Sequence, residues 1–223
     1  RADEAGAGEA LFIEDLDARR TAGASREPGA LRLSVRRVGR INADLTIGAD
    51  LTEARPLAAN AGLCFQGMNL VGEGFRVSAA EAEALRGERL RRYVQGRDLK
   101  AGSMSRYVID LYDLDEASAR AAAPGCVAHL ERTVRPERIH NSRDVYARRW
   151  WQFGEPRPGL RRALVGLKKY IATPETSAHR FFVMVEADVV PDHQIYVVAS
   201  EDLFVFGVLS SRVHAAWARR AGG

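Results

Sequence analysis

The last third of the chain contains Tyr170-Ile-Ala172, Arg180-Phe-Phe-Val-Met-Val-Glu186 and Gln194-Ile-Tyr-Val-Val-Ala199. Each segment is short and rich in β-branched or aromatic residues, which is typical of strands, whereas helices are longer and repeat their apolar residues every three or four positions. Polar stretches with Pro, Ser and Asp separate the segments, as in connections between neighbouring strands. We therefore predict three strands here, in a largely antiparallel sheet.

Further strands and helices are predicted before and after these segments. Ser78-Ala-Ala-Glu81 is a capping box, in which the Ser and Glu side chains satisfy backbone N–H groups at the start of a helix. Gly72 and Gly74 favour a turn that joins residues 65–71 and 75–77 in a hairpin, Pro124-Gly125 favours a helix end, and Ser200 is placed to cap a helix. Other predicted strands are 31–35 and 107–112, with loop-like sequence over 39–62. The predicted helices are 11–20, 78–85, 116–122, 127–134, 144–153, 160–167, 203–209 and 213–219.

The fold class expected from this order is α+β, with a mixed, largely antiparallel sheet and flanking short helices. Pro28-Gly29 ends an N-terminal stretch with few structural signals, so we expect residues 1–29 to be a poorly ordered lead-in and residues 30–223 to form one domain with a C-terminal helical segment. No apolar run approaches the about 20 residues that a transmembrane helix needs, so no membrane span is expected. Cys64 and Cys126 cannot form a disulfide framework, which favours a reducing, cytoplasmic setting.

Positive charge is concentrated between Glu131 and Arg180. This segment has twelve Lys and Arg residues against five Asp and Glu residues, a net charge of +7, whereas the whole chain has +4. A basic segment on a near-neutral background is typical of a face that contacts phosphates, although solvated helix faces explain it equally well. Almost all the cations are Arg, which suits bidentate contacts to phosphate and guanine.

The sequence lacks the motifs of a catalytic centre. It has no Gly-x-Gly-x-x-Gly loop for a nucleotide and no Asp/Asn-Pro-Pro-aromatic tetrapeptide, with which amino-methylating enzymes hold a flipped base. Asp110, Asp113 and Asp115 are interpreted as a turn and a helix N-terminus rather than a metal site, and Pro191-Asp192 as a turn between strands rather than a nuclease carboxylate cluster. The five histidines have neither HExxH spacing nor a neighbouring Cys pair. We therefore expect no catalytic residue and no metal site in this chain.

Several contiguous stretches of the chain occur in the same order in one known family. They are Gly39-Arg-Ile-Asn-Ala-Asp-Leu-Thr-Ile-Gly48, Phe65-Gln-Gly-Met-Asn-Leu-Val-Gly-Glu-Gly-Phe75, Gly96-Arg-Asp-Leu99, Arg106-Tyr-Val-Ile-Asp110, Val134-Arg-Pro-Glu-Arg138, Tyr146-Ala-Arg-Arg-Trp-Trp-Gln-Phe-Gly-Glu-Pro-Arg157, Tyr170-Ile-Ala-Thr-Pro-Glu-Thr-Ser-Ala-His-Arg-Phe-Phe182 and Gly207-Val-Leu-Ser-Ser-Arg-Val-His-Ala-Ala-Trp217. In these stretches the chain resembles the MmeI-like (type IIL) restriction–modification enzymes and related class I SAM-dependent adenine-specific DNA methyltransferases.

The resemblance implies the DNA target-recognition domain of such an enzyme, a module that carries no cofactor itself. In the family this domain follows a methyltransferase catalytic domain, which transfers a methyl group from S-adenosylmethionine to adenine N6. Many members also have an N-terminal endonuclease domain, which needs Mg²⁺ if it cleaves. Residues 1–29 would then be a linker from the upstream catalytic domain. The implied partners are double-stranded DNA and the catalytic domain of the same polypeptide, in the bacterial cytoplasm and without a membrane.

Two segments with donors and acceptors for base edges are the first candidates for DNA contact. The loop Arg138-Ile-His-Asn-Ser-Arg143 offers Asn141 and Arg143, which suit adenine and guanine, with Arg138 and His140 beside them. The loop between the predicted strands at 170–172 and 180–186 offers Thr176, Ser177, His179 and Arg180 at a strand end. The alternatives are an ordinary turn with a solvated Arg in the first loop, and a capped turn with Arg180 in a structural ion pair in the second.

Four further cations are candidates for phosphate contact. Arg148 and Arg149 precede two tryptophans, and successive helical residues point about 100° apart, so we expect one Trp to be buried while an Arg faces phosphate. Lys168 and Lys169 precede a strand and are expected to hold a phosphate without sequence preference.

Two other classes of function remain open at this point. The chain is alternatively a protein-interaction or specificity scaffold that touches DNA little, or a freestanding hydrolase or nuclease with a site of no known motif. The charge concentration favours DNA binding over the scaffold, and the missing motifs count against the enzyme.

Overall fold

The computed structural model describes residues 10–15, 33–38, 41, 54–85, 89–103, 105–177 and 179–220. The chain divides into two compact units, residues 1–56 and 57–223. The boundary expected at residues 29/30 lies inside the first unit.

The described part of the first unit is a pair of strands. β1 (Ala10–Asp15) pairs antiparallel with β2 (Leu33–Val38). The helix predicted from residue 11 is therefore wrong up to residue 15, and its remainder lies outside the described residues. Ala-Leu-Phe-Ile-Glu-Asp has no strong helical period, and pairing with β2 provides hydrogen-bond partners that local sequence does not show.

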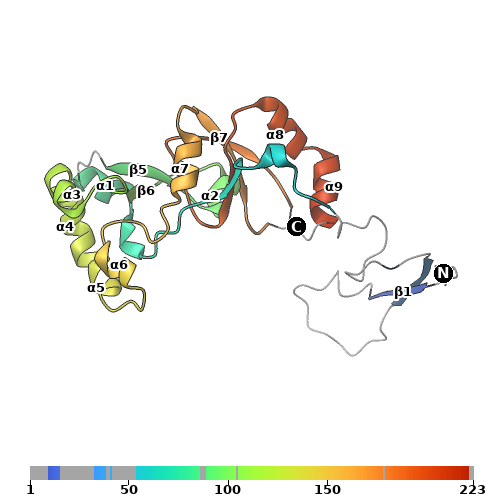
Figure 1. Cartoon of the computed structure of the whole chain (residues 1–223), viewed down its shortest axis with the longest axis horizontal. Coiled ribbons are helices and arrows are strands. Elements are labelled where there is room, and N and C mark those ends of the chain that lie inside the picture. Colours follow the sequence, from blue (N-terminus) through green and yellow to red (C-terminus); the bar gives the residue numbers. More distant parts are fainter. Residues whose placement is uncertain are drawn as a thin grey trace, which may run out of the picture. The chain divides into compact units, whose positions relative to one another are not determined.

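The second unit contains a four-stranded antiparallel sheet in the order β3-β10-β7-β8. Its strands are β3 (Cys64–Gln66), β10 (Ile195–Val198), β7 (Lys169–Pro174) and β8 (Val183–Glu186) (Figure 1). The three strands predicted over 170–199 are thus confirmed and lie side by side. β7 is one of the two inner strands and is buried at every residue after Lys169.

A second sheet of the same unit has the order β4-β6-β5-β9. Its strands are β4 (Arg76–Val77), β6 (Arg106–Ile109), β5 (Leu90–Val94) and β9 (Val190–Pro191); β5 and β9 are parallel and the other pairs antiparallel. The hairpin predicted over 65–77 is wrong, because β3 and β4 belong to different sheets. Between them η2 (Glu73–Phe75) directs the fully buried Phe75 ring against Phe153, a long-range contact that the sequence does not reveal.

Short helices flank the sheets, as expected for the α+β class (Figure 1). They are η1 (Ala58–Asn60), α1 (Ala79–Leu85), α2 (Gly96–Ala101), α3 (Glu116–Ala122), α4 (Pro124–Thr133), α5 (Arg135–Arg138), α6 (Asp144–Arg148), α7 (Pro158–Leu164), α8 (Leu203–Leu209) and α9 (Arg212–Arg220). α2 and α5 were not predicted, and α6 ends five residues before the predicted end at residue 153.

The helix ends confirm the capping box at Ser78 and the helix end before Pro124, and they correct the cap predicted at Ser200. Ser78 and Glu81 form the predicted capping box: the Glu81 carboxylate accepts from the Ser78 N–H at 2.8 Å, and Ser78 Oγ accepts from the Glu81 N–H at 3.3 Å. Pro124 begins α4 instead of only ending α3, because a first helical residue needs no N–H donor. α8 is capped by Asp202, whose carboxylate accepts from the Phe204 N–H at 2.7 Å, and not by Ser200.

The segment Gly67–Val71 runs from one sheet to the helical region and is called the 67–71 segment below. At its start the Gly67 N–H donates to the Ile195 carbonyl and the Met68 N–H to the Pro191 carbonyl, both at 2.8 Å. Gly67 is required there, because a Cβ would overlap the Asp192 carbonyl oxygen. At its end the Leu70 carbonyl accepts from the Gly154 N–H at 3.1 Å. The segment therefore links residues beside β9 and β10 to residues around α6.

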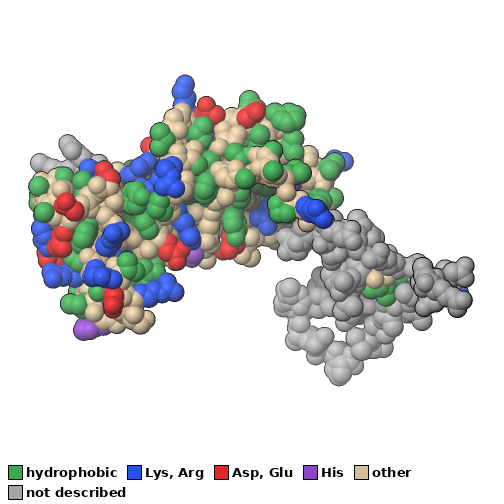
Figure 2. Space-filling model, in the orientation of Figure 1, with side chains coloured by type: hydrophobic (Ala, Val, Ile, Leu, Met, Phe, Trp, Pro, Cys, Tyr) green, Lys and Arg blue, Asp and Glu red, His purple; other side chains and the backbone are tan. Residues whose placement is uncertain are grey.

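The surface differs between the two ends of the second unit. Figure 2 shows Lys and Arg mixed with Asp and Glu over the region of α3 to α7, and hydrophobic side chains over α8. The exposed apolar side chains of α8 and α9 are Leu203, Phe204, Val208, Val213 and Trp217. Among the described residues, no helix has the length and apolar character needed to cross a membrane.

Candidate nucleic-acid interface

The residues predicted around β7 lie at its two opposite ends. Lys168 and Lys169 are exposed at its start, whereas Thr176 to Arg180 follow its end. Six strand residues separate the two groups by about 20 Å. Lys169 Nζ lies 3.5 Å from the Glu186 carboxylate across the sheet, and both side chains are half exposed, so this pair contributes little to stability.

The β7–β8 loop presents polar side chains to solvent. Thr176, Ser177 and His179 are exposed, and Ser177 Oγ donates to the His179 carbonyl at 2.7 Å. Arg180 is half-buried, and its Nη1 donates to the Pro174 carbonyl at 2.7 Å. Arg180 therefore stabilises the base of the loop by a hydrogen bond to a backbone carbonyl. The sequence had left open a structural ion pair instead.

The turn between β9 and β10 lies directly beside this loop. The Glu175 N–H donates to the Gln194 carbonyl at 2.8 Å, and Pro174 pairs with Ile195. His193 and Gln194 are therefore part of the same polar end of the sheet. The sequence indicates only a connection here, because the proximity of the turn to the β7–β8 loop depends on the register of β7 and β10.

The N-terminus of α2 packs on the same end of the sheet. A Cβ at Gly96 would lie 3.3 Å from the Pro174 side chain, which brings the first turn of α2 against the end of β7. Arg97 and Lys100 of α2 are exposed and add two cations near the β7–β8 loop. These cations lie outside the basic segment 131–180, so the local charge count did not identify them.

Arg138 does not fit the predicted DNA contact, because it is only 2% exposed. Its Nη2 donates to the Leu70 carbonyl at 2.6 Å, its Nε to the Val71 carbonyl at 2.9 Å, and its Nη1 to the Gln152 carbonyl at 2.5 Å. The guanidinium also lies 4.9 Å from the centre of the Phe75 ring. Burial lowers the pKa of Arg138 to about 10. We interpret Arg138 as a structural residue that joins the 67–71 segment to the α6 region.

The rest of the α5–α6 loop is accessible. His140 and Arg143 are exposed and Asn141 is half-buried. Asn141 Oδ1 accepts from the Arg143 N–H at 2.9 Å, and Arg143 Nη1 donates to Tyr146 Oη at 2.8 Å. The loop is thus held in one conformation, with Asn141 and Arg143 beside each other at its surface.

Arg148 and Arg149 are exposed at the end of α6, while Trp150 and Trp151 are both buried, at 4% and 8% exposure. We predicted one buried Trp, whereas the structure buries both. Trp151 Nε1 donates to the Leu114 carbonyl at 3.0 Å, and the Trp150 ring lies below the guanidinium of Arg135. Neither indole is available to stack on a base.

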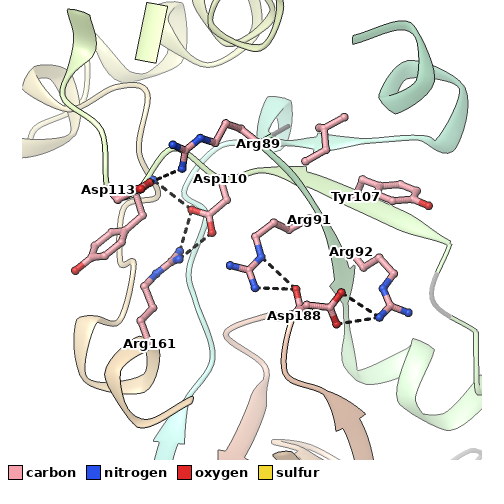
Figure 3. A pocket seen from close by; sticks show the side chains of 10 residues that line it. Arg89, Arg91, Arg92, Tyr107, Asp110, Asp113, Arg161 and Asp188 are labelled. Carbon is pink, nitrogen blue, oxygen red and sulfur yellow. Dashed lines mark hydrogen bonds and ion pairs between the residues drawn. The ribbon is translucent and has the colours of Figure 1, made fainter. Parts of the chain in front are cut away.

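An open cleft of about 580 Å³ carries four arginines and three aspartates. Figure 3 shows how they pair: Arg89 with Asp113 at 2.7 Å, and Arg92 with Asp188 at 2.9 Å. Arg91 donates to the backbone carbonyl of Asp188 at 3.0 and 3.1 Å. Three carboxylates against four guanidiniums leave one formal positive charge. The cleft is mainly a set of internal ion pairs, with Arg91 as the cation that has no carboxylate partner among the described residues.

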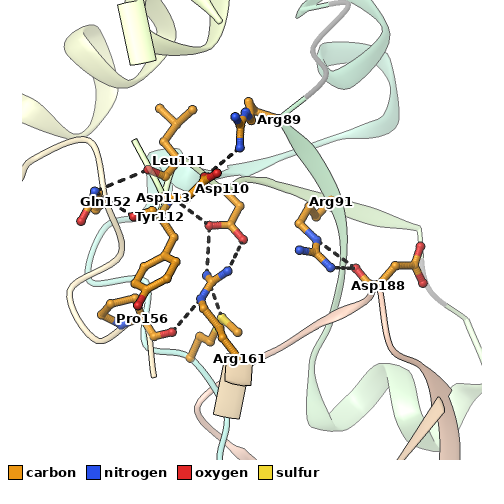
Figure 4. A network of polar contacts seen from close by, with 11 residues as sticks. Arg89, Arg91, Asp110, Leu111, Tyr112, Asp113, Gln152, Pro156, Arg161 and Asp188 are labelled. Atoms are coloured by element: carbon orange, nitrogen blue, oxygen red, sulfur yellow. Dashed lines mark hydrogen bonds and ion pairs between the residues drawn. The ribbon is translucent and has the colours of Figure 1, made fainter. Parts of the chain in front are cut away.

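The most buried ion pair of this cleft is Arg161 with Asp110. Arg161 Nη1 and Nη2 donate to the two carboxylate oxygens at 2.8 and 3.0 Å, and Nε donates to the Pro156 carbonyl at 2.9 Å (Figure 4). The side chains are 15% and 4% exposed, and the guanidinium lies 4.4 Å from the centre of the Tyr112 ring. This pair ties α7 to the end of β6.

The three aspartates considered as metal ligands have other roles. Asp110 holds Arg161, Asp113 pairs with Arg89, and Asp115 caps α3 by accepting from the Ser118 N–H at 2.7 Å. Burial is the largest single influence on Asp113 and raises its pKa, but the Arg89 guanidinium, a backbone hydrogen bond and the charge of Arg161 together lower the pKa below its ordinary value. In the part of the chain that the structure describes, no three His, Cys, Asp or Glu side chains are grouped to hold a metal.

Comparison with known proteins identifies this arrangement. The family model described as "MmeI, target recognition domain" matches residues 65–223, which include both candidate loops. The chain belongs to this target-recognition-domain family. The resemblance inferred from the sequence stretches is thereby confirmed.

The fold is similar to that of a solved structure, reported as the type IIL restriction–modification enzyme MmeI in complex with DNA. The TM-score is 0.65 at 20% sequence identity, over 83% of this chain. This chain covers 26% of the length of that MmeI chain. A comparison with curated proteins finds no match. The likeness confirms the predicted α+β class with largely antiparallel sheets.

Proposed function

We propose that the chain is the sequence-specific double-stranded DNA recognition module of a SAM-dependent adenine-N6 DNA methyltransferase that combines restriction and modification. The observation that carries this proposal is the family match over residues 65–223. The module positions the target base for a catalytic domain elsewhere in the parent polypeptide. S-adenosylmethionine, and Mg²⁺ where the parent cleaves, belong to that parent, and a bacterial cytoplasmic setting follows from the same assignment.

The geometry supports recognition of one duplex by both loops. The 67–71 segment touches the β9–β10 turn at Gly67 and reaches Arg138, at the start of the α5–α6 loop, through Leu70 and Val71. Five extended residues span at most about 18 Å. One turn of B-DNA is about 34 Å long. The segment that links the two regions is therefore shorter than one turn of the duplex.

Different residues are proposed for base and phosphate contact. Base edges are read by Asn141 and Arg143 in the α5–α6 loop and by Thr176 and Ser177 in the β7–β8 loop, because these side chains offer donors and acceptors at positions that are exposed or, for Asn141, half-buried. Phosphates are held by exposed or half-exposed groups that carry or can carry positive charge. These are Arg148, Arg149, Lys168, Lys169, His140 and His179. Arg180 stabilises the base of the β7–β8 loop.

A methyltransferase domain of the same polypeptide is proposed as the second partner. Its docking surface is the apolar face of α8 and α9, which includes Phe204 at 77% and Trp217 at 52% exposure. Exposed apolar side chains grouped on neighbouring helices are typical of interfaces between domains or proteins. The same face favours the second candidate function, a scaffold that binds proteins and touches DNA little.

Salt dependence of duplex binding separates the two candidates. Four cations on phosphates predict that log K falls with log salt with a slope of about −4, so affinity drops steeply between about 50 and 200 mM salt. We expect the chain to bind duplexes weakly and with this slope, measured by fluorescence anisotropy. Absence of salt-sensitive binding to any duplex at low ionic strength supports the scaffold instead. Methylation of adenine by the parent, with a site preference that changes when this module is exchanged, tests the assignment of the enzyme.

A further inference from the structure

A buried carboxylate organises the β9–β10 turn from inside. Asp192 is 3% exposed, and its Oδ2 accepts from the hydroxyl of Tyr93, which is fully buried on β5. Its Oδ1 accepts from the Gln194 N–H at 2.9 Å and lies 3.2 Å from His193 Nδ1. Burial, together with the Asp192 carboxylate, raises the pKa of Tyr93, so the phenol keeps its proton and remains the donor. Two hydrogen bonds and one edge of the His193 ring therefore meet at one carboxylate.

The backbone of this turn is also held from outside. The Asp192 N–H donates to the Val94 carbonyl at 2.9 Å, and the Gln194 carbonyl accepts from the Glu175 N–H at 2.8 Å. Gly67 approaches the Asp192 carbonyl so closely that no side chain fits between them. The turn is thus fixed to β5, to the β7–β8 loop and to the 67–71 segment. A constellation held on rigid elements in this way is preorganised for recognition.

Two polar side chains of this turn are directed away from the core. The His193 side chain is 41% exposed, and because its Nδ1 lies against Asp192, its Nε2 lies on the opposite edge of the ring. The carboxylate favours the tautomer with hydrogen on Nδ1, which leaves Nε2 of a neutral imidazole as an acceptor. Gln194 is exposed, and its side-chain amide has no partner among the described residues. The turn therefore offers one acceptor and one donor–acceptor pair to solvent, beside the β7–β8 loop.

We propose that His193 and Gln194 read base edges in the major groove of the target duplex. Gln194 matches adenine, whose N6 amino group and N7 are contacted by the oxygen and nitrogen of a side-chain amide. His193 Nε2, as an acceptor, matches a base with a major-groove amino group, which is adenine N6 or cytosine N4. Asp192 and Tyr93 are positioning residues that hold the imidazole and the turn. This inference rests on the proposed function and adds a third reading element to the two loops.

Selection of bound sequences from a randomised duplex library tests the base contacts. Wild type is compared with His193→Ala and Gln194→Ala, and with Asn60→Ala as the matched control. Asn60 is exposed in η1, four residues before Cys64, the end of β3 that pairs with Val198, so it lies at the opposite end of β3 from the turn. Loss of one bidentate pair reduces discrimination at its base pair by about 5- to 100-fold.

We expect Gln194→Ala to lose the preference for adenine at a single position, and His193→Ala to lose the preference for adenine or cytosine at a nearby position. Asn60→Ala should select the same sequences as wild type. If wild type selects a sequence and both turn variants select the same one, the inference is overturned while the proposed function stands. A wild-type chain that binds duplex without any preference overturns both.

Tyr93→Phe tests the positioning role, with Tyr112→Phe as the control. Both substitutions remove one hydroxyl, but only the Tyr93 hydroxyl has a hydrogen-bond partner among the described residues. We expect Tyr93→Phe to weaken the preference at the position assigned to His193 or Gln194, with an unchanged salt slope. A loss of thermal stability with the sequence preference intact overturns the positioning role of Tyr93.

Discussion

Arg138 Nη2 lies 2.6 Å from the carbonyl oxygen of Leu70, a residue 68 positions earlier in the chain. The Arg138 guanidinium has no carboxylate partner among the described residues, and its hydrogen bonds go to backbone carbonyls on two separate segments. The buried guanidinium supplies hydrogen bonds to backbone carbonyls that lie outside regular helices and strands. The α5–α6 loop therefore depends on a contact inside the protein for its position at the surface.

Replacement of Arg138 by Met should lower the free energy of unfolding by about 3 kcal/mol, since the substitution leaves several buried carbonyls without a donor. The measurement is urea unfolding at neutral pH. Arg132→Met, at an exposed position of α4, is the matched control and should change the stability by less than about 0.5 kcal/mol. Equal effects of the two substitutions would contradict the structural role of Arg138.

Arg161→Lys should destabilise the protein by about 2 kcal/mol, because a lysine keeps the charge but not the two-point contact with Asp110. Its effect on the salt slope of DNA binding should be negligible, since this guanidinium is held by Asp110 and Pro156. Arg162→Lys, exposed on the same helix, is the control for stability. A reduced salt slope with normal stability would instead assign Arg161 to phosphate contact.

Arg148→Gln and Arg149→Gln should each reduce the magnitude of the salt slope by about one and leave stability unchanged. Both side chains are exposed. Arg120→Gln removes the same charge from an arginine already paired with Glu116 and Glu131, and it should leave the slope at the wild-type value. Anisotropy titrations at several salt concentrations measure this difference. If the wild type and all three variants had the same salt slope, Arg148 and Arg149 at the end of α6 would not contact DNA phosphates.

Asn141→Ala should change which duplex sequence is preferred, because an amide that contacts a base edge contributes discrimination of about 1–3 kcal/mol at one base pair. Ser142→Ala, at the exposed neighbouring position, is the control and should select the wild-type sequence. Competition between duplexes that differ at one base pair measures the effect. Uniformly weaker binding with unchanged preference would assign Asn141 to the DNA backbone.

Glu81→Gln should lower stability at pH 7 but not in acid. Hydrogen bonds from Ser78 hold the pKa of Glu81 below its ordinary value of 4.5. The stabilisation by the ionised carboxylate is therefore present above pH 4.5 and is lost as the pH falls through the lower pKa of the folded state. Urea unfolding at several pH values should show the stabilities of the two proteins converging as the pH falls below 4.5. Glu83→Gln, exposed on the same helix, is the control, and a difference that persists in acid would point to helix propensity instead.

The sequence by itself determined the features that depend on neighbouring residues. The strands at β7, β8 and β10, the capping box at Ser78 and the helices α1 and α3 follow from short-range patterns, and the structure confirms them. The same patterns failed at residues 65–77, where two glycines favour a hairpin but the flanking strands join different sheets. Stretches of sequence that occur in the same order in one family indicated the recognition domain without the fold.

Only the tertiary structure decided which polar side chains face solvent. Arg138 and Arg143 belong to one polar loop in the sequence, yet one is buried on the carbonyls of Leu70 and Val71 and the other is exposed. Tyr93 and Asp192 form a hydrogen bond although 99 positions separate them, and the same carboxylate lies 3.2 Å from His193 Nδ1. Burial and orientation result from pairings between distant segments, whose register is set by packing across two sheets. Local sequence therefore specifies the strands and helices, while the packing between them selects the residues that remain available for DNA.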